Sequence, residues 1–162
     1  MTERGGITKA QLIADLTRMQ QRVSELEKLV DAQKATETKA IEDRLMFEGL
    51  FELNPDALIL VDSRGSITRV NIEAERMFGY SHEELKGKPH DVLIPEQFRE
   101  MHKVQMAGYM ASPRTRKMGV GLDLFGRKKD GTIFPVDISL GVLGTGKEFV
   151  TIIAAVRARS SI

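Results

Sequence analysis

A heptad repeat in the first third of the chain constrains the fold more than any other feature. Residues 7–48 contain neither proline nor glycine and are rich in good helix formers. Apolar residues recur at alternating spacings of four and three, at Leu12, Leu16, Met19, Val23, Leu26 and Val30. This spacing is that of the a/d seam of a left-handed coiled coil. We therefore predict a long helix over residues 7–48 that pairs with a second copy of the chain as a parallel homodimer.

The heptad repeat shifts register in its second half. Ile41 follows Val30 by 11 residues, one heptad plus four, and such a stutter locally unwinds a supercoil. Ile41 and Leu45 complete the predicted dimer interface. The alternative is an amphipathic helix packed on its own domain, but the apolar stripe is narrow, which favours the coiled coil. Residues 1–6 are predicted to be a disordered start.

The middle of the chain has alternating strand and helix signals. Two apolar segments of strand length flank a turn at residues 63–66, which predicts a hairpin. Asn71 is a good N-cap for a short helix, and Ser81 with Glu84 forms a capping-box sequence for a second one. These signals indicate short helices that follow directly on the first hairpin.

The last third of the chain has the two-residue periodicity of β-strands. Apolar and other residues alternate over 118–124 and again over 134–142, and Asp130-Gly131 between them is a strong hairpin signal. Residues 149–156 form a nearly continuous apolar strand. With the first hairpin, this predicts an α+β domain with a five-stranded antiparallel sheet and helices on one face.

A longer helix is predicted between the two halves of the sheet, over residues 95–111. Pro95 suits its first turn. At about 100° per residue, one face is shared by Phe98, His102, Gln105, Met106 and Tyr109. A histidine therefore lies in a mostly apolar stripe, either as a hydrogen-bonded core residue or as a ligand.

The order and content of these segments resemble the PAS family. The matching motifs are N-P-D-A-L-I-L-V-D, G-S-I-T-R-V-N, E-R-M-F-G-Y-S-H-E-E-L-K-G, L-I-P-E-Q-F-R-E-M-H and G-R-K-K-D-G-T-I-F-P-V-D-I-S-L. The resemblance covers residues 51–157 and leaves 158–162 as a tail. It implies a sensory or dimerisation module whose sheet and helices enclose a cleft, preceded by a helix that mediates a parallel dimer.

Within that family, the segment P-E-x-x-R-x-x-H resembles haem-binding oxygen sensors of the rhizobial kinase type. The resemblance implies that His102 would be the proximal iron ligand, which is its only predicted metal role. One departure is Leu122, which stands where those sensors place an arginine near bound ligand. We expect no resident cofactor, with haem b as the alternative. The candidate cofactor-binding residues are His102, Met106, Tyr109, Val120, Leu122, Val136, Ile138 and Leu140.

Composition excludes several other classes of function. The net charge of +1 gives no electrostatic footprint for nucleic acid, and no apolar run approaches the roughly 20 residues that span a bilayer. Without cysteine there is no disulfide, thiolate site or cysteine-dependent flavin photochemistry. The histidines at 82, 90 and 102 match no zinc motif in their spacing. No nucleophile or acid–base constellation emerges, so we do not expect an enzyme.

Together these features predict a cytoplasmic regulatory module of a signal-transduction protein. It would dimerise through its N-terminal helix and relay ligand- or partner-dependent changes to an effector such as a kinase or cyclase. The alternatives are a haem-based gas or redox sensor and a ligand-free dimerisation scaffold. The final strand leads to Ala158, where PAS domains commonly have an acidic residue before an effector. We expect either a piece of a longer protein or a module that acts on a separate partner.

Overall fold

The computed structural model describes residues 8–111, 114–117, 123–144 and 151–159. They belong to two compact units, one up to Phe47 and one from Glu48 onward. The predicted disordered start and the last residues of the predicted tail lie outside the described residues. No helix in the described part of the chain is long and apolar enough to cross a membrane.

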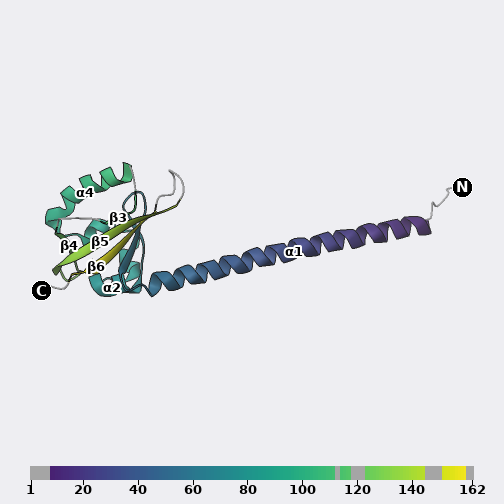
Figure 1. Cartoon of the computed structure of the whole chain (residues 1–162), viewed down its shortest axis with the longest axis horizontal. Helices are drawn as coiled ribbons and strands as arrows, with labels where there is room; N and C mark the ends of the chain where they lie inside the picture. The colour runs from purple at the N-terminus through teal and green to yellow at the C-terminus, as the bar shows by residue number, and fades with distance from the viewer. Residues whose placement is uncertain (1–7, 112–113, 118–122, 145–150, 160–162) are drawn as a thin grey trace. The chain divides into compact units, whose positions relative to one another are not determined.

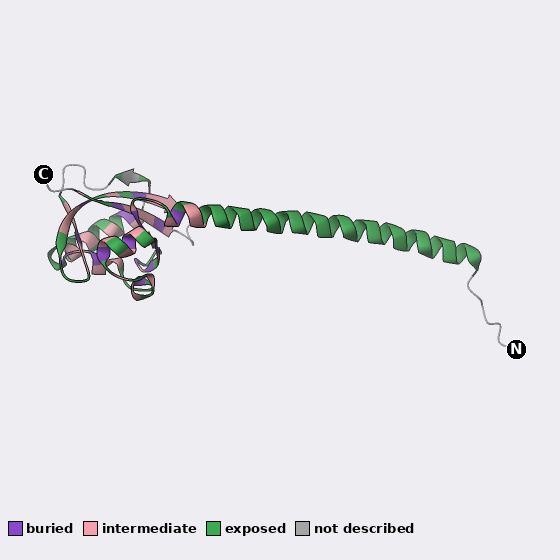
Figure 2. Ribbon diagram, turned by 90° about the horizontal axis from the view of Figure 1, so that it is seen from below, coloured by how far each residue is buried: buried purple, intermediate pink, exposed green. Residues whose placement is uncertain are grey.

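The helix α1 runs over Lys9–Glu52 (Figure 1). Its part up to Phe47 belongs to the first unit, and its last residues belong to the second. Thr8 caps its start: the hydroxyl accepts from the amide of Gln11, and the Gln11 side chain accepts from the amide of Thr8. The eight predicted seam residues are 47–65% exposed on the single chain. Figure 2 accordingly shows α1 as exposed along most of its length. Pairing through this seam stays a prediction.

The helix ends four residues later than predicted. The predicted end at residue 48 followed from Gly49, because glycine costs about 1 kcal/mol relative to alanine in a helix. Tertiary contacts of the last turn outweigh this cost. Phe51 is 2% exposed and packs on Leu58 and Leu60, and Glu48 and Glu52 both pair with the guanidinium of Arg69.

The second unit contains an antiparallel sheet. Its strands are β1 (Ala57–Val61), β2 (Ile67–Val70), β3 (Arg116–Lys117), β4 (Leu124–Arg127), β5 (Ile133–Leu143) and β6 (Thr151–Ala158). The order is β2-β1-β6-β5-β3, and β4 also pairs with β5. One edge of β5 pairs with β6. Its other edge pairs with β4 at residues 133–136 of β5 and with β3 at residues 139–140 of β5. The predicted five-stranded α+β sheet is therefore confirmed, with its outer position divided between two short strands.

Four helical segments connect the two halves of this sheet. They are α2 (Ile72–Phe78), α3 (His82–Leu85), the 3-10 helix η1 (His90–Leu93) and α4 (Glu96–Ala111) (Figure 1). The predicted caps are confirmed: Asn71 accepts from the amide of Ala74, and Ser81 and Glu84 form a capping box. Ile72, the first residue of α2, is 44% exposed. Ala74 and Phe78 are the buried residues of α2.

The two faces of the central strands are covered by different elements. Ala57, Ile59 and Val61 of β1 belong to the main apolar core with residues of α2, α3 and η1. Leu58 and Leu60 alternate with them and face the opposite side, where they pack on Phe51 of α1. Figure 2 shows buried residues both in the strands and in the helices of this unit. The sheet is thus a single layer between the α1 end and the core that holds the cavity described below.

Asn71 joins three elements at the edge of this layer. Its side chain is fully buried and makes four hydrogen bonds. The amide group donates to the carbonyls of Phe51 and Asp56, both at 3.0 Å, and the oxygen accepts from the amides of Leu58 at 2.8 Å and Ala74 at 3.0 Å. One side chain therefore holds the end of α1, the start of β1 and the start of α2 together.

Candidate functional site

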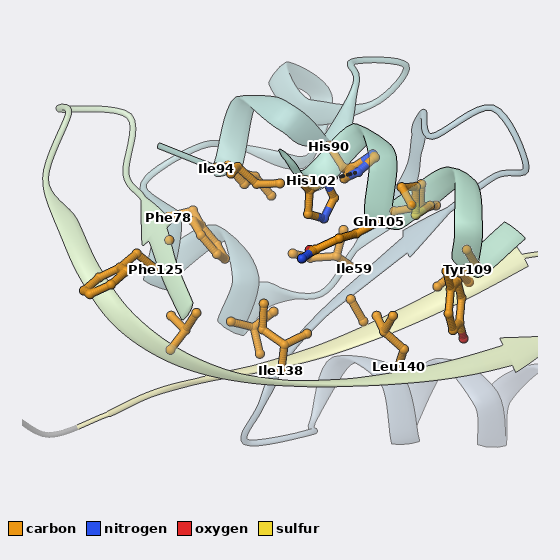
Figure 3. Close-up of a pocket in the computed structure, with 18 residues that line it drawn as sticks. Ile59, Phe78, His90, Ile94, His102, Gln105, Tyr109, Phe125, Ile138 and Leu140 are labelled. Atoms are coloured by element: carbon orange, nitrogen blue, oxygen red, sulfur yellow. Dashed lines mark hydrogen bonds between the residues drawn. The ribbon is translucent and has the colours of Figure 1, made fainter. Parts of the chain in front are cut away.

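A small apolar cavity lies between α4 and the face of the sheet opposite Phe51 (Figure 3). Its volume is about 100 Å³. Residues of β1, β5 and β6 form its floor, and α4 with η1 forms its roof. Six of the eight predicted cofactor-binding residues line it: His102, Met106, Tyr109, Val136, Ile138 and Leu140. Val120 and Leu122 lie outside the described residues. Binding of a cofactor by this set stays a prediction.

The roof of the cavity follows from the periodicity of α4. His102, Met106 and Tyr109 are spaced by four and three residues, so they lie on one side of the helix. Tyr109 is 5% exposed, and its hydroxyl donates to the carbonyl of Arg114 at 2.8 Å. Phe98, one turn before His102, stacks on Phe125 of β4 with ring centroids 5.9 Å apart. These contacts fix the inner face of α4 over the sheet.

The polar groups at the cavity come mainly from α4 and η1. His90, His102 and Gln105 are the lining residues with polar side-chain groups besides Tyr109. The Nδ1 atom of His102 lies 3.3 Å from the Nε2 atom of His90. Figure 3 shows the ring of His102 between His90 and the cavity, so its second ring nitrogen is turned towards the cavity. The site thus presents an imidazole to an otherwise apolar space.

Burial keeps the imidazole of His102 neutral at physiological pH. Desolvation lowers its pKa below the ordinary value of 6.5, and the neighbouring His90 lowers it further, while Asp91 opposes both effects. A neutral imidazole is the form that hydrogen-bonds in both directions or binds a metal. Its free lone pair is therefore available without removal of a proton.

The sequence patterns do not predict that His102 forms a cluster with His90 and Asp91. His90 and Asp91 belong to η1 and meet His102 of α4, with candidate ligand atoms of all three within 4.8 Å of one another. The sequence feature that indicates their proximity is the short connection between η1 and α4, which makes these two segments neighbours in space. The spacing of the histidines alone carries no such information.

The described residues form an α+β domain in which helices cover one face of an antiparallel sheet above a small apolar cavity. The chain belongs to the PAS family: the family model described as the PAS fold matches residues 45–157. This confirms the resemblance found in the sequence motifs. The match begins six residues before the predicted boundary at 51, within the last turns of α1.

Two known proteins with similar sequences are named as sensors. The chain is 30% identical over 119 residues to the sensor protein FixL of Bradyrhizobium diazoefficiens, covering 74% of this chain and 24% of FixL. It is 30% identical over 105 residues to the oxygen sensor protein DosP of Escherichia coli, covering 65% of this chain and 12% of DosP. The chain therefore spans a quarter or less of the length of these relatives, and it is a PAS sensory domain of the kind found in signal-transduction proteins.

A solved structure shows the same fold. The PAS domain of an HTR-like protein from Haloarcula marismortui superposes with a TM-score of 0.64 at 23% identity, covering 78% of this chain and 99% of that domain. The similarity supports the arrangement of sheet and helices described above.

The cavity is too small for haem in this structure, although the imidazole of His102 is a suitable iron ligand. His102 supplies a neutral imidazole with apolar surroundings, which suits a haem ligand. A porphyrin, however, is a drug-sized ligand, and sites for such ligands span roughly 300–1,000 Å³. The volume here is about 100 Å³. The space between α4 and the sheet is that of an occupant with few atoms.

Proposed function

We propose that this chain is a cytoplasmic, non-catalytic regulatory module that detects a small ligand between α4 and the sheet. It dimerises through α1 and relays the state of the cavity to an effector. The observation that carries the proposal is the apolar cavity with polar groups at its roof. Apolar cavities of about 150 Å³ bind guests as large as benzene, so about 100 Å³ suits a somewhat smaller molecule.

The predicted dimer rests on the apolar seam of α1. Its eight residues form two heptad-spaced stretches on either side of the stutter between Val30 and Ile41, and all are exposed on the single chain. Burial of a leucine or valine side chain contributes about 1.5–3 kcal/mol, and a parallel pair of helices buries each seam position twice. A second copy of the chain is the partner with a matching seam, which supports a parallel homodimer.

The sheet supplies a physical route from the cavity to α1. Ile59 and Ala154 line the cavity, whereas Leu58, Leu60 and Ala155, their neighbours on the same strands, pack with Phe51 of α1. A shift of these strands therefore changes the contacts of the last turn of α1. Packed helices respond to such shifts by changing between discrete arrangements. The effector would lie elsewhere in a longer protein or in a separate partner.

A haem-based gas or redox sensor is the second candidate, because the imidazole of His102 faces the cavity and DosP is an oxygen sensor. Hemin added to the purified protein distinguishes the two. From the cavity volume we expect an absorption spectrum equal to that of free hemin. A shifted Soret band that His102→Ala abolishes and His82→Ala retains would contradict the small-ligand proposal and establish the haem sensor. His82 is the matched control because it belongs to α3, away from the cavity lining.

The third candidate is a ligand-free dimerisation scaffold. It shares the seam of α1 with the leading proposal and differs in giving the cavity no role. A filled cavity would then leave the dimer unchanged, whereas the sensory proposal requires the dimer to respond.

A further inference from the structure

Three side chains with metal-binding atoms converge at the contact between η1 and α4. His90 and Asp91 are consecutive residues of η1, and His102 lies on the inner face of α4. Each side chain is 17–20% exposed, so the cluster is mostly shielded from solvent but not sealed. The rings of the two histidines meet edge to face with centroids 4.9 Å apart. This is a pre-formed group and not a chance approach of mobile surface side chains.

The facing atoms have the separations of ligands around one small cation. The Nε2 atom of His90 lies 3.3 Å from Nδ1 of His102 and 3.7 Å from Oδ1 of Asp91, and the last two atoms are 3.6 Å apart. A cation in the plane of these three atoms and equally far from each would lie about 2 Å from all of them. This distance is the length of a Zn–N or Zn–O bond. Calcium, with bonds of 2.3–2.6 Å and oxygen ligands, suits the group less well.

The second ring nitrogen of His90 has the partner that metal-binding histidines typically have. Its Nδ1 atom lies 2.7 Å from the carbonyl oxygen of Gly65, in the β1–β2 turn. Because a carbonyl only accepts, Nδ1 carries the hydrogen, and Nε2 keeps its lone pair directed at the cluster. A backbone carbonyl in this role fixes the tautomer and the orientation of the ring.

The carboxylate of Asp91 has an unused acceptor, and the backbone of Asp91 is held in place. Its Oδ1 atom is buried and has no hydrogen-bond partner among the described residues. The backbone around it is fixed, because Nε of Arg99 donates to the carbonyls of Asp91 at 3.0 Å and Ile94 at 3.1 Å. A buried acceptor without a donor is unfavourable, and a bound cation would remove that cost.

We propose that His90, Asp91 and His102 bind a divalent transition-metal ion, with Zn²⁺ as the best fit. Two imidazoles and one carboxylate supply three ligands and leave at least one coordination position for water or an exogenous ligand. The site lies at the rim of the cavity and does not depend on which ligand occupies the cavity.

Metal binding would change the chemistry of the cavity through the ring of His102. Without metal, Nδ1 of His102 is placed to donate to Nε2 of His90, which leaves Nε2 of His102 as an acceptor turned towards the cavity. With metal on Nδ1, the same proton resides on Nε2, which becomes a donor. No proton is gained or lost overall. The metal would therefore alter which occupants the cavity prefers.

Titration of the purified chain with Co²⁺ and Zn²⁺ tests the site. One equivalent of Co²⁺ should give visible d–d absorption of a four- or five-coordinate complex, and Zn²⁺ should displace it. Asp91→Asn and His90→Gln should each weaken Zn²⁺ binding by about 100-fold or more, because loss of a ligand exceeds loss of an outer partner. His82→Gln, the matched histidine control, should leave the affinity unchanged.

Histidine ring ¹⁵N spectra of the wild-type chain give a readout that does not require a variant to fold. Zn²⁺ should shift Nε2 of His90 and Nδ1 of His102 and move the proton of His102 to Nε2, while the resonances of His82 stay in place. Ring resonances of His90 and His102 that are indifferent to a stoichiometric amount of Zn²⁺ would overturn the proposal. The proposal would also be overturned if His82→Gln weakened Zn²⁺ binding as much as His90→Gln.

Discussion

Asn71→Ala is expected to lower the free energy of unfolding by about 3–5 kcal/mol, the largest effect of a single uncharged substitution that we predict. The substitution removes four buried hydrogen bonds at once and leaves the carbonyls of Phe51 and Asp56 and the amides of Leu58 and Ala74 without this partner. A buried polar group that loses its partner costs about 1–3 kcal/mol. Urea unfolding followed by circular dichroism at a fixed protein concentration measures the change.

Two further variants separate the parts of this network. Asn71→Asp keeps the oxygen that accepts from Leu58 and Ala74 but loses both donated bonds, so it should also destabilise strongly. Asn54→Ala is the matched control, because the side-chain oxygen of Asn54 accepts a local, part-buried bond of 2.9 Å from the amide of Asp56. Its cost should stay near 1 kcal/mol. A loss below 1 kcal/mol for Asn71→Ala would contradict the role assigned to this side chain.

The double variant Leu16→Glu/Val23→Glu is expected to raise the dimer dissociation constant by about 1,000-fold or more. Each chain loses two apolar seam residues, and the dimer loses four, at about 1.5–3 kcal/mol each before any charge repulsion. Both residues are more than half exposed on the single chain, so the isolated helix should tolerate the changes. Sedimentation equilibrium measures the constant.

The matched control for the seam is Thr17→Glu/Ser24→Glu. It adds the same charges one residue further along the helix, outside the seam, and both positions are exposed. This variant should remain a dimer. A wild-type chain that is monomeric at high concentration, or a control that dissociates as readily as the seam variant, would contradict the predicted coiled coil.

Local sequence signals predicted most of the secondary structure, because each depends on residues close together in the chain. The caps at Asn71 and Ser81, the turn at Asp130-Gly131 and the face of α4 all follow from spacings of a few residues. The motif order then predicted the family. What these signals could not predict depends on contacts between distant residues.

The late end of α1 is one example, because it results from Phe51 packing on β1 and from the pairing of Glu48 with Arg69. The four bonds of Asn71 are a second example, since a cap sequence predicts only the bond to Ala74. The cluster at His90 and His102 is the third: its members come together only when η1 and α4 pack over the sheet. The cavity volume, too, is a property of the packed side chains and not of any motif.

The central claim is that the cavity and α1 are coupled. Its most direct test is the dimer dissociation constant of a variant whose cavity is filled. Ala154 lines the cavity from β6, so Ala154→Leu places a larger side chain in that space. Ala158→Leu makes the same change at an exposed position of the same strand and is the control. Coupling between two sites typically changes affinity by about 5–150-fold. We predict that Ala154→Leu changes the constant by about fivefold or more and that Ala158→Leu leaves it unchanged. Equal constants for the wild type and a folded Ala154→Leu would contradict the account and favour a scaffold.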